Sequence, residues 1–361
     1  MSLRYSMNSE INESEEIDPS TAMKIFKTTL WAAILVLSCT TLMAQGLTKE
    51  LDNRQPTILV AALSKWIPLA STGNAEAQFN VGLMYKDGDG VPQDYAKAAE
   101  WYRKAAEQGY AEAQYYLGVS YYYGEGVHQD DTEAAKWYRK AADQGYAPSE
   151  YALGHMFRDG RGVPQDSGEA VKWYRKAAEH RLRHAQYSLG RMYKEGEGVS
   201  QDSTEAAKWF RRAANQRYAQ AQFQLGVIYQ LGQGVPQDYN TAVEWYQKAA
   251  EQEYPNAQYN LGVLYQLGEG VSQDFTEAAK WFRRAADLRY AKAQFQLGVM
   301  YQLGQGVAQD FKTAVDWYLR AAAQGDSNAQ YNLGVLYQLG EGVAQDYTES
   351  ANWYSEAAKP R

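Results

Sequence analysis

The sequence predicts an all-α protein, a right-handed α/α superhelix (solenoid) of eight helix-turn-helix repeats of 36 residues each. The prediction depends on three features that return every 36 residues without an insertion. They are a tryptophan (first Trp101, last Trp353), a glycine inside an apolar pattern (first Gly82, last Gly334) and a Gly-x-Gly pair (first at Gly88). A fixed period of this length is typical of solenoids, whose units bury their apolar faces only against their neighbours.

The repeats fill the chain from Asn74 to its last residue. Their predicted bounds are 74–109, 110–145, 146–181, 182–217, 218–253, 254–289, 290–325 and 326–361. Upstream, residues 45–73 are predicted to be an N-terminal capping half-repeat, in which 57–73 form a helix and Gly73 is in register with Gly109.

The first helix of each repeat is expected over a segment such as 75–85. Ala77, Val81 and Met84 share one face of it at helical spacing. Gly82 lies beside that face, although glycine costs about 1 kcal/mol in a helix interior relative to alanine. Its recurrence indicates that a neighbouring helix approaches too closely for a side chain.

The second helix is expected over a segment such as 95–108. Small and large residues alternate there, with alanines beside Trp101 and Tyr102. The alanines allow close helix contact, and the rings fill the remaining volume.

The connection between the two helices is read from 229–239, YQLGQGVPQDY. Gly232 is expected to end the first helix in the left-handed conformation, and Gly234 to allow the next turn. Val235 is expected to be a buried anchor, and Asp238 to cap the second helix. In five repeats the equivalent Asp is followed three residues later by Glu, which predicts a capping box: Asp130, Asp166, Asp202, Asp274 and Asp346. The same glycines do not fit a phosphate-binding loop, because the required further glycine or Gly-Lys pair is absent.

The linked patterns A-x-A-Q-x-x-L-G-x-x-Y, G-x-G-V and A-A-x-W-Y-x-K-A-A, as in 219–250, resemble the Sel1-like repeat, a relative of the tetratricopeptide repeat. The resemblance covers 74–361. It implies an α-solenoid with a protein-binding surface. Cysteine-rich members of this family have been linked to β-lactams, but they carry a cysteine pair in each repeat, whereas this chain has only Cys39.

The amino end predicts export. Residues 23–44 combine two lysines, an apolar run over 30–37 and a small-residue end, which is typical of a signal peptide. Cleavage is expected after Ala44, and residues 1–22 are an acidic, non-native or disordered leader if translation begins at Met23. The alternative is a lipobox ending at Cys39, which would then carry a lipid anchor. The expected location is periplasmic or secreted, or the membrane surface for the lipoprotein.

Composition and motifs argue against several functions. A net charge of −7 does not favour nucleic acid, and no apolar stretch is long enough to span a bilayer. Signatures of nucleophilic or metal-dependent catalysis are missing, so we expect no enzyme, cofactor or metal. The spacing of His180 and His184 resembles that of a zinc protease, but Arg181 stands where the Glu is needed, and we interpret this segment as a basic surface. His128 and His155 are interpreted as ordinary surface or groove residues.

An aromatic series also repeats: Phe79, Tyr115, Tyr151, Tyr187, Phe223, Tyr259, Phe295 and Tyr331. These rings could form a stacking platform for single-stranded nucleic acid or sugar. Their recurrence at a single position of the repeat favours packing, as it does for the tryptophans.

Positions that vary among repeats are the candidates for recognition. On the first helices, four repeats carry mixed pairs (Lys86-Asp87, Tyr122-Tyr123, Arg158-Asp159 and Lys194-Glu195), whereas the last four are uniform. The predicted groove residues are Gln224, Val227, Gln230, Leu231, Asn260, Val263, Gln266, Leu267, Gln296, Val299, Gln302 and Leu303, and Asn332, Val335, Gln338 and Leu339 continue the series. A near-repeat of 72 residues offers another explanation, because recent duplication would also make these repeats uniform.

We therefore expect an exported adaptor or scaffold of the cell envelope that binds a protein or peptide. The alternative is an envelope enzyme or inhibitor acting on peptidoglycan or a β-lactam.

Overall fold

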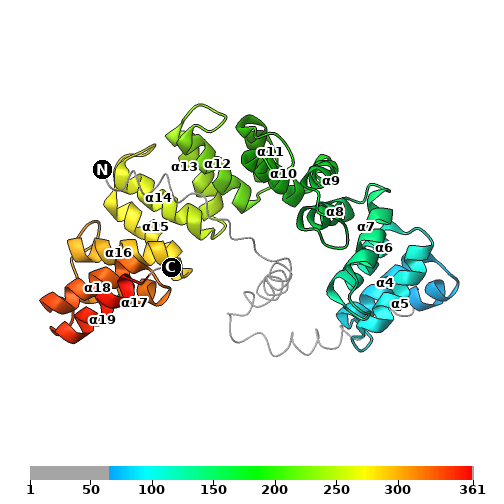
Figure 1. Cartoon of the computed structure of the whole chain (residues 1–361), viewed down its shortest axis with the longest axis horizontal. Helices are drawn as coiled ribbons and strands as arrows, with labels where there is room; N and C mark the ends of the chain where they lie inside the picture. The colour runs from blue at the N-terminus through cyan, green and yellow to red at the C-terminus, as the bar shows by residue number, and fades with distance from the viewer. Residues whose placement is uncertain (1–64, 360–361) are drawn as a thin grey trace, which may run out of the picture. The chain divides into compact units, whose positions relative to one another are not determined.

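A computed structural model describes residues 65–359 of the chain. All regular secondary structure in this range is helical, which confirms the predicted all-α class. A short helix over 65–71 is followed by the helices α4 to α19 (Figure 1). The predicted leader, the signal peptide with Cys39 and the cap residues 45–64 lie outside the described residues, so those expectations stay predictions.

The chain divides into two compact units. The first ends at Gln144 and contains α4 (Ala75–Asp87), α5 (Tyr95–Glu107), α6 (Ala111–Tyr123) and α7 (Asp131–Ala142). The second begins at Gly145 and contains α8 (Ala147–Asp159), α9 (Ser167–Glu179), α10 (Arg183–Glu195), α11 (Ser203–Asn215), α12 (Ala219–Leu231), α13 (Tyr239–Ala250), α14 (Pro255–Leu267), α15 (Phe275–Asp287), α16 (Ala291–Leu303), α17 (Phe311–Ala323), α18 (Ser327–Leu339) and α19 (Tyr347–Ala357). Within each unit, every helix packs on the helices before and after it in the chain.

The glycine inside each first helix faces an aromatic ring of the second helix. A Cβ added at Gly226 would lie 2.4 Å from the ring of Tyr246, and one at Gly190 would lie 2.8 Å from Phe210. Both rings are fully buried. The close approach predicted from this glycine is confirmed, and it joins the two helices of one repeat.

Each first helix ends at a left-handed glycine, and each second helix begins at an aspartate. Gly232 has φ 68° and caps α12, while Asp238 Oδ1 accepts hydrogen bonds from the backbone N–H groups of Asn240 and Thr241. Both cap predictions are confirmed. Val235, predicted to be a buried anchor, is only half-buried, because the loop that carries it lies at the surface.

The predicted capping box is wrong in its second half. In a capping box the Glu side chain accepts from the N–H of the cap residue. Here the N–H of Asp130 donates to the carbonyl of Tyr121 at 2.9 Å, so the first helix already satisfies it. Glu133 instead pairs with Lys136 at 2.6 Å. The cap N–H therefore ties the two helices of a repeat together.

The second glycine of the Gly-x-Gly pair is a contact between repeats at six positions: Gly126, Gly198, Gly234, Gly270, Gly306 and Gly342. Gly234 has φ 71°, and a Cβ there would lie 2.4 Å from the carbonyl carbon of Ser203 at the start of α11. A Cβ at Gly270 would likewise meet the backbone carbonyl of Tyr239, the first residue of α13. At these positions the glycine therefore lets the loop lie on the second helix of the preceding repeat.

A buried glutamine also joins successive repeats. The Gln222 amide donates to the carbonyl of Ala214 at 3.1 Å, and Gln222 Oε1 accepts from Gln252 at 2.6 Å. Ala214 belongs to the preceding repeat, and Gln252 belongs to the same repeat as Gln222. The Gln222 side chain therefore links the two repeats. Its recurrence in the Ala-x-Ala-Gln pattern has this structural reason.

The repeated rings pack on rings of the second helices, which supports packing as their role, although Tyr331 in the last repeat is 56% exposed. Phe223 lies with its centroid 5.7 Å from Tyr246 and 5.4 Å from Tyr254. Trp173 and Trp317 are each 4% exposed, which leaves them little surface for stacking on a ligand.

At the start of the described range, Ala70 of the helix over 65–71 packs with Ala77 and Val81 of α4.

Candidate functional site

The candidate surface is the outward side of the first helices α12, α14, α16 and α18, which we call the first-helix face. It carries the predicted groove residues. The structure separates them by exposure, because one side of each helix is turned into the repeat. Val227 and Val263 are buried at 0% and 1% exposure, so they belong to the core and not to a groove. Val299 and Val335 are half-buried.

Three of the glutamines are held by tyrosine hydroxyls of the second helices. Tyr246 donates to Gln230 Oε1 at 2.6 Å, and Tyr318 donates to Gln302 Oε1 at 2.7 Å. Gln338 accepts in the same way from Tyr354 at 3.0 Å. Gln230 is only 3% exposed, so its first role is structural. Burial raises the pKa of the Tyr246 and Tyr318 hydroxyls, which keeps these donors protonated.

Gln266 differs from these three. The second-helix residue of its repeat is Phe282, which is fully buried and has no hydroxyl. Gln266 and Gln296 are both half-buried, and within 65–359 neither side-chain amide has a hydrogen-bond partner. Gln224, at the position of Gln296 two repeats earlier, accepts from Lys194 Nζ at 3.1 Å. The remaining members of the series, Asn260 and Asn332, are half-buried beside the hydroxyls of Tyr246 and Tyr318.

The leucines at the ends of the first helices provide the apolar part of the face. Leu303 and Leu339 are each 57% exposed, whereas Leu231 and Leu267 are half-buried. Exposed leucines that recur at one position differ from scattered surface residues, because they line up from repeat to repeat. The predicted groove residues that remain available to a partner are therefore the leucines, with Gln266 and Gln296 between them.

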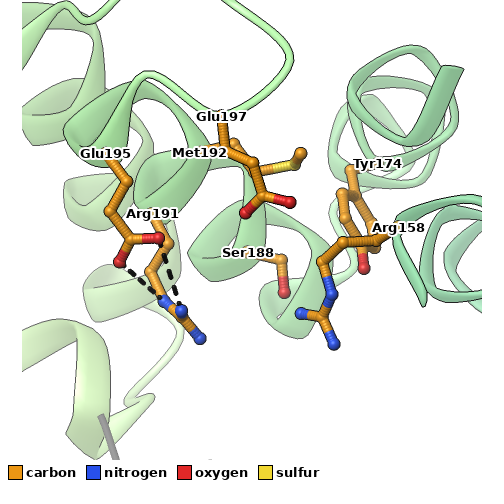
Figure 2. A pocket seen from close by; sticks show the side chains of 7 residues that line it. All are labelled: Arg158, Tyr174, Ser188, Arg191, Met192, Glu195 and Glu197. Atoms are coloured by element: carbon orange, nitrogen blue, oxygen red, sulfur yellow. Dashed lines mark hydrogen bonds and ion pairs between the residues drawn. The ribbon is translucent and has the colours of Figure 1, made fainter. Parts of the chain in front are cut away.

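The same side of α8 and α10 carries charge and contains a small polar hollow. Arg158, Tyr174, Ser188, Arg191, Met192, Glu195 and Glu197 line it (Figure 2). Figure 2 shows Arg191 directed at Glu195, and their Nε and Oε1 atoms are 3.3 Å apart. Arg158 pairs with Asp159 at 2.8 Å. Because both guanidinium groups already have carboxylate partners, the hollow offers no unbalanced positive charge to an anion.

The histidines do not form a metal site. Within 65–359 there is no group of three or more His, Cys, Asp or Glu side chains that could hold a metal ion. The His184 ring lies 5.0 Å from the ring of Tyr218, and its burial lowers the pKa of the imidazole. His155 packs on Tyr151 at 4.5 Å. The predicted basic surface at 180–184 is therefore wrong for His184, which is a neutral, packed side chain.

His180 belongs to a pair that was not predicted from the sequence. Its Nε2 lies 3.9 Å from Glu150 Oε1. Glu150 is 2% exposed and stands at the position of the buried glutamine that joins repeats. Glu150 and His180 thus replace the Gln-Gln pair formed by Gln186 and Gln216 one repeat later. Comparing these positions among the repeats would have revealed the exchange.

No helix among residues 65–359 is long and apolar enough to cross a membrane. A comparison with curated proteins gave no match.

Solved structures with the same architecture exist. A Sel1 repeat protein from Oxalobacter formigenes is 33% identical, with a TM-score of 0.66, over 84% of this chain and 89% of that one. A protective antigen from uropathogenic Escherichia coli strains, described as having an SLR fold, is 30% identical, with a TM-score of 0.67, over 88% of this chain and 79% of that one.

The model of the Sel1 repeat matches eight times, at residues 75–110, 111–146, 147–181, 183–218, 219–254, 255–290, 291–326 and 327–359. The matches differ from the predicted bounds of the repeats by at most two residues. Solenoids of this kind are typical of protein–protein interaction scaffolds. The chain belongs to the Sel1 repeat family.

Proposed function

We propose that the protein is an exported scaffold of the cell envelope, and that it binds a protein or peptide on the first-helix face of its last four repeats. The observation that carries the proposal is the exposure of Leu303 and Leu339 on that face, each at 57%. A stable fold has no need of such leucines at the surface, and their burial against a partner would release water from apolar area.

The face is already organised for binding. Each first helix is fixed by a left-handed glycine at its end, by the close packing of its inner glycine and by the glutamine that joins repeats. A partner would therefore not have to order the receptor, and this lowers the free-energy cost of association.

Export is supported by the order of lysines, apolar residues and small residues over 23–44. The structural relative described as a protective antigen is in keeping with a protein that antibodies can reach. We propose cleavage after Ala44, with lipidation at Cys39 as the other form of processing. Mass spectrometry of the mature N-terminus distinguishes them, since only the lipidated form begins at Cys39 and carries acyl mass. An uncleaved chain recovered from the cytoplasm would overturn the export proposal.

Binding is tested with a variant in which Leu231, Leu267 and Leu303 are all changed to Glu. We expect this variant to lose capture of its partner from envelope extract by more than about tenfold, because three carboxylates would have to be desolvated in the interface. Quantitative pull-down measures the effect, and circular dichroism checks that the helical content is unchanged.

The matched control places the same substitution outside the face. Leu288 and Leu319 are 41% and 36% exposed, at the end of α15 and on α17, so L288E/L319E changes charge and apolarity without touching the first helices. We expect normal capture by this control. Equal capture by both variants would refute the proposed face.

A further inference from the structure

The second helices of the last four repeats carry tyrosine at one position, Tyr246, Tyr318 and Tyr354, except for Phe282. Tyr246 and Tyr318 each bond the glutamine of their own first helix, Gln230 and Gln302. Asn260 and Asn332, from the next repeats, lie against the same hydroxyls. These amides therefore have their hydrogen-bond partners inside the fold.

Phe282 interrupts this series. Without a hydroxyl there, the amides of Gln266 on α14 and Gln296 on α16 have no partner within 65–359. Their positions are those of Lys194 and Gln224 two repeats earlier, whose polar atoms come within 3.1 Å of each other. The two amides therefore start from neighbouring sites and can bond the same ligand group. A half-buried amide with no partner loses hydrogen bonds to water when a ligand covers it, unless the ligand replaces them.

The charge around this pair restricts the ligand. The helix α14 has no charged residue, and α16 has only Lys292, in its first turn. The nearest charged residues in the sequence, Lys292 before Gln296 and Glu269 after Gln266, already have partners within the fold. A charged group bound between the two amides would therefore lose hydration without gaining a free counter-ion. Leu267 follows Gln266 directly, and Leu303 lies two turns after Gln296 on α16; both favour apolar side chains. The site thus fits a ligand that is polar but uncharged at its centre and apolar on either side.

We infer that Gln266 and Gln296 bind the main chain of an uncharged, extended segment of a partner protein, whose apolar side chains pack against Leu267 and Leu303. Each glutamine amide has one acceptor and one NH₂ donor, which match the N–H and C=O of a peptide group. The inference rests on the proposed binding function and adds the class of segment and the place where it is held.

A sugar chain would also offer hydrogen-bonding groups, but the rings at the repeated position of α14 and α16 are packed and not free to stack on it. Tyr259 and Phe295 are the aromatic residues at the repeated ring position of α14 and α16, and both are packed on rings of the second helices, Phe282 at 5.5 Å and Tyr318 at 5.9 Å. The observations therefore favour a peptide.

The test uses a random peptide library displayed on phage and selected on the full chain. We expect the selected peptides to be uncharged at their centre and to carry aliphatic residues. The best peptide is synthesised with a fluorescent label, and its Kd is measured by anisotropy for the wild type and for three variants: F282Y, Q266A and Y318F.

F282Y adds the hydroxyl that Tyr246 and Tyr318 already carry at this position. We expect it to engage Gln266 as Tyr246 engages Gln230, and to weaken peptide binding about fivefold to tenfold, the loss expected for one or two neutral hydrogen bonds. The Q266A variant is expected to show a similar loss and keeps the test decisive if F282Y does not fold. Y318F frees Gln302 instead of engaging it, so its affinity is expected to equal or exceed that of the wild type.

The outcomes separate this inference from the proposed function. If F282Y and Q266A bind the peptide as the wild type does while L231E/L267E/L303E loses it, the face binds peptides but this amide pair does not, and the inference fails alone. Enrichment of charged peptides, or failure to select any, also overturns it. Binding of a peptidoglycan fragment that F282Y abolishes would assign the site to a glycan instead. If the triple variant retains partner capture, the proposed function fails as well.

Discussion

The second compact unit carries two different surfaces on one scaffold. Its two earliest first helices, α8 and α10, carry the charged residues Arg158, Asp159, Arg191, Lys194 and Glu195. Its last four, α12, α14, α16 and α18, carry valine, glutamine and leucine at the same positions. The caps, the inner glycine and the turn are the same in both groups. Recognition and folding are therefore assigned to different positions of the repeat.

The comparison also shows that one position of the repeat, that of Lys194 and Gln230, can link a first helix either to the next repeat or to its own second helix. Lys194 bonds Gln224 of the next repeat, whereas Gln230, at the same position one repeat later, bonds Tyr246 of its own repeat. A lysine reaches across to its neighbour, and burial lowers the pKa of the Lys194 amine. The change from charged to neutral residues thus alters which elements are linked, as well as what a partner would meet.

If both regions share one packing scheme, the same substitution in that packing should lower the free energy of unfolding by the same amount in each. We expect Gly190→Ala in the charged region and Gly226→Ala in the neutral region each to lower the free energy of unfolding by about 3 kcal/mol. The reason is that the new methyl would lie within 2.9 Å of the Phe210 or Tyr246 ring, and both rings are fully buried. Urea denaturation followed by circular dichroism measures the loss.

Gly168 provides the control. It also lies in a helix, α9, but a Cβ there meets only Asp166 Oδ1 within 3.4 Å. We expect Gly168→Ala to change stability by less than about 1 kcal/mol, since the gain in helix propensity offsets a small shift of the Asp166 side chain that caps α9. A large loss in one region and none in the other would show that the two regions do not share one packing scheme.

Most of the fold could be predicted from the sequence, because each recurring residue has a local physical reason to recur. The left-handed glycine, the Asp cap and the glycine under the aromatic ring are of this kind. The capping box failed because the N–H of Asp130 is satisfied by Tyr121, and the pairing of these residues follows from how the two helices pack. Val235 was wrongly predicted to be buried for a similar reason, since its exposure depends on where the loop lies.

A second prediction concerns the beginning of the charged region. Glu150 is almost fully buried, and its Oε2 atom has no hydrogen-bond partner within the described chain. Burial raises the pKa of this carboxyl above its ordinary value, although the positive charges of His180 and Lys176 oppose the shift and Glu179 adds to it. Ionised Glu150 therefore costs stability, and this cost appears as pH rises from about 4.5 through the pKa of the folded state.

We expect Glu150→Gln to stabilise the protein by about 1–2 kcal/mol at pH 7 and by much less near pH 4, where the wild-type carboxyl is protonated and resembles an amide. Denaturant titrations at several pH values measure the difference. The double variant E150Q/H180Q should stabilise at least as much, since it restores a Gln-Gln pair like that of Gln186 and Gln216. A pH-independent effect of E150Q would show that desolvation of the carboxylate is not the cause.

The candidate site was less predictable than the fold. Helical spacing placed Val227 and Leu231 on one side, and the sequence could not show that the first is buried and the second is not. The role of Gln230 could not be predicted either, because its partner Tyr246 lies on another helix. The exchange of Tyr for Phe282 can be seen in the sequence once the contact is known. Without the packing it reads as a conservative change.

The third and smallest effect concerns the turn after the second helix, which has the same conformation in both regions. Arg181 and Arg217 in the charged region, and Glu253 and Arg289 in the neutral region, have φ between 59° and 64°. Gly109 has φ 88° at the equivalent position. A residue with a Cβ is strained in this conformation, whereas glycine is not. We expect Arg217→Gly and Glu253→Gly each to raise the free energy of unfolding by about 0.5–1 kcal/mol, after allowance for the greater freedom of glycine in the unfolded chain.

The reverse substitution tests the effect of the backbone strain by itself. A Cβ at Gly109 would meet no atom within 4 Å, so Gly109→Arg introduces strain without a clash and should lower stability by a similar amount. Thermal unfolding measured by calorimetry detects changes of this size. If Arg217→Gly instead destabilises the protein, the arginine side chain must contribute more than its backbone strain costs. The same test at Glu253 then shows whether that contribution belongs to the charged region alone or to this turn wherever it occurs.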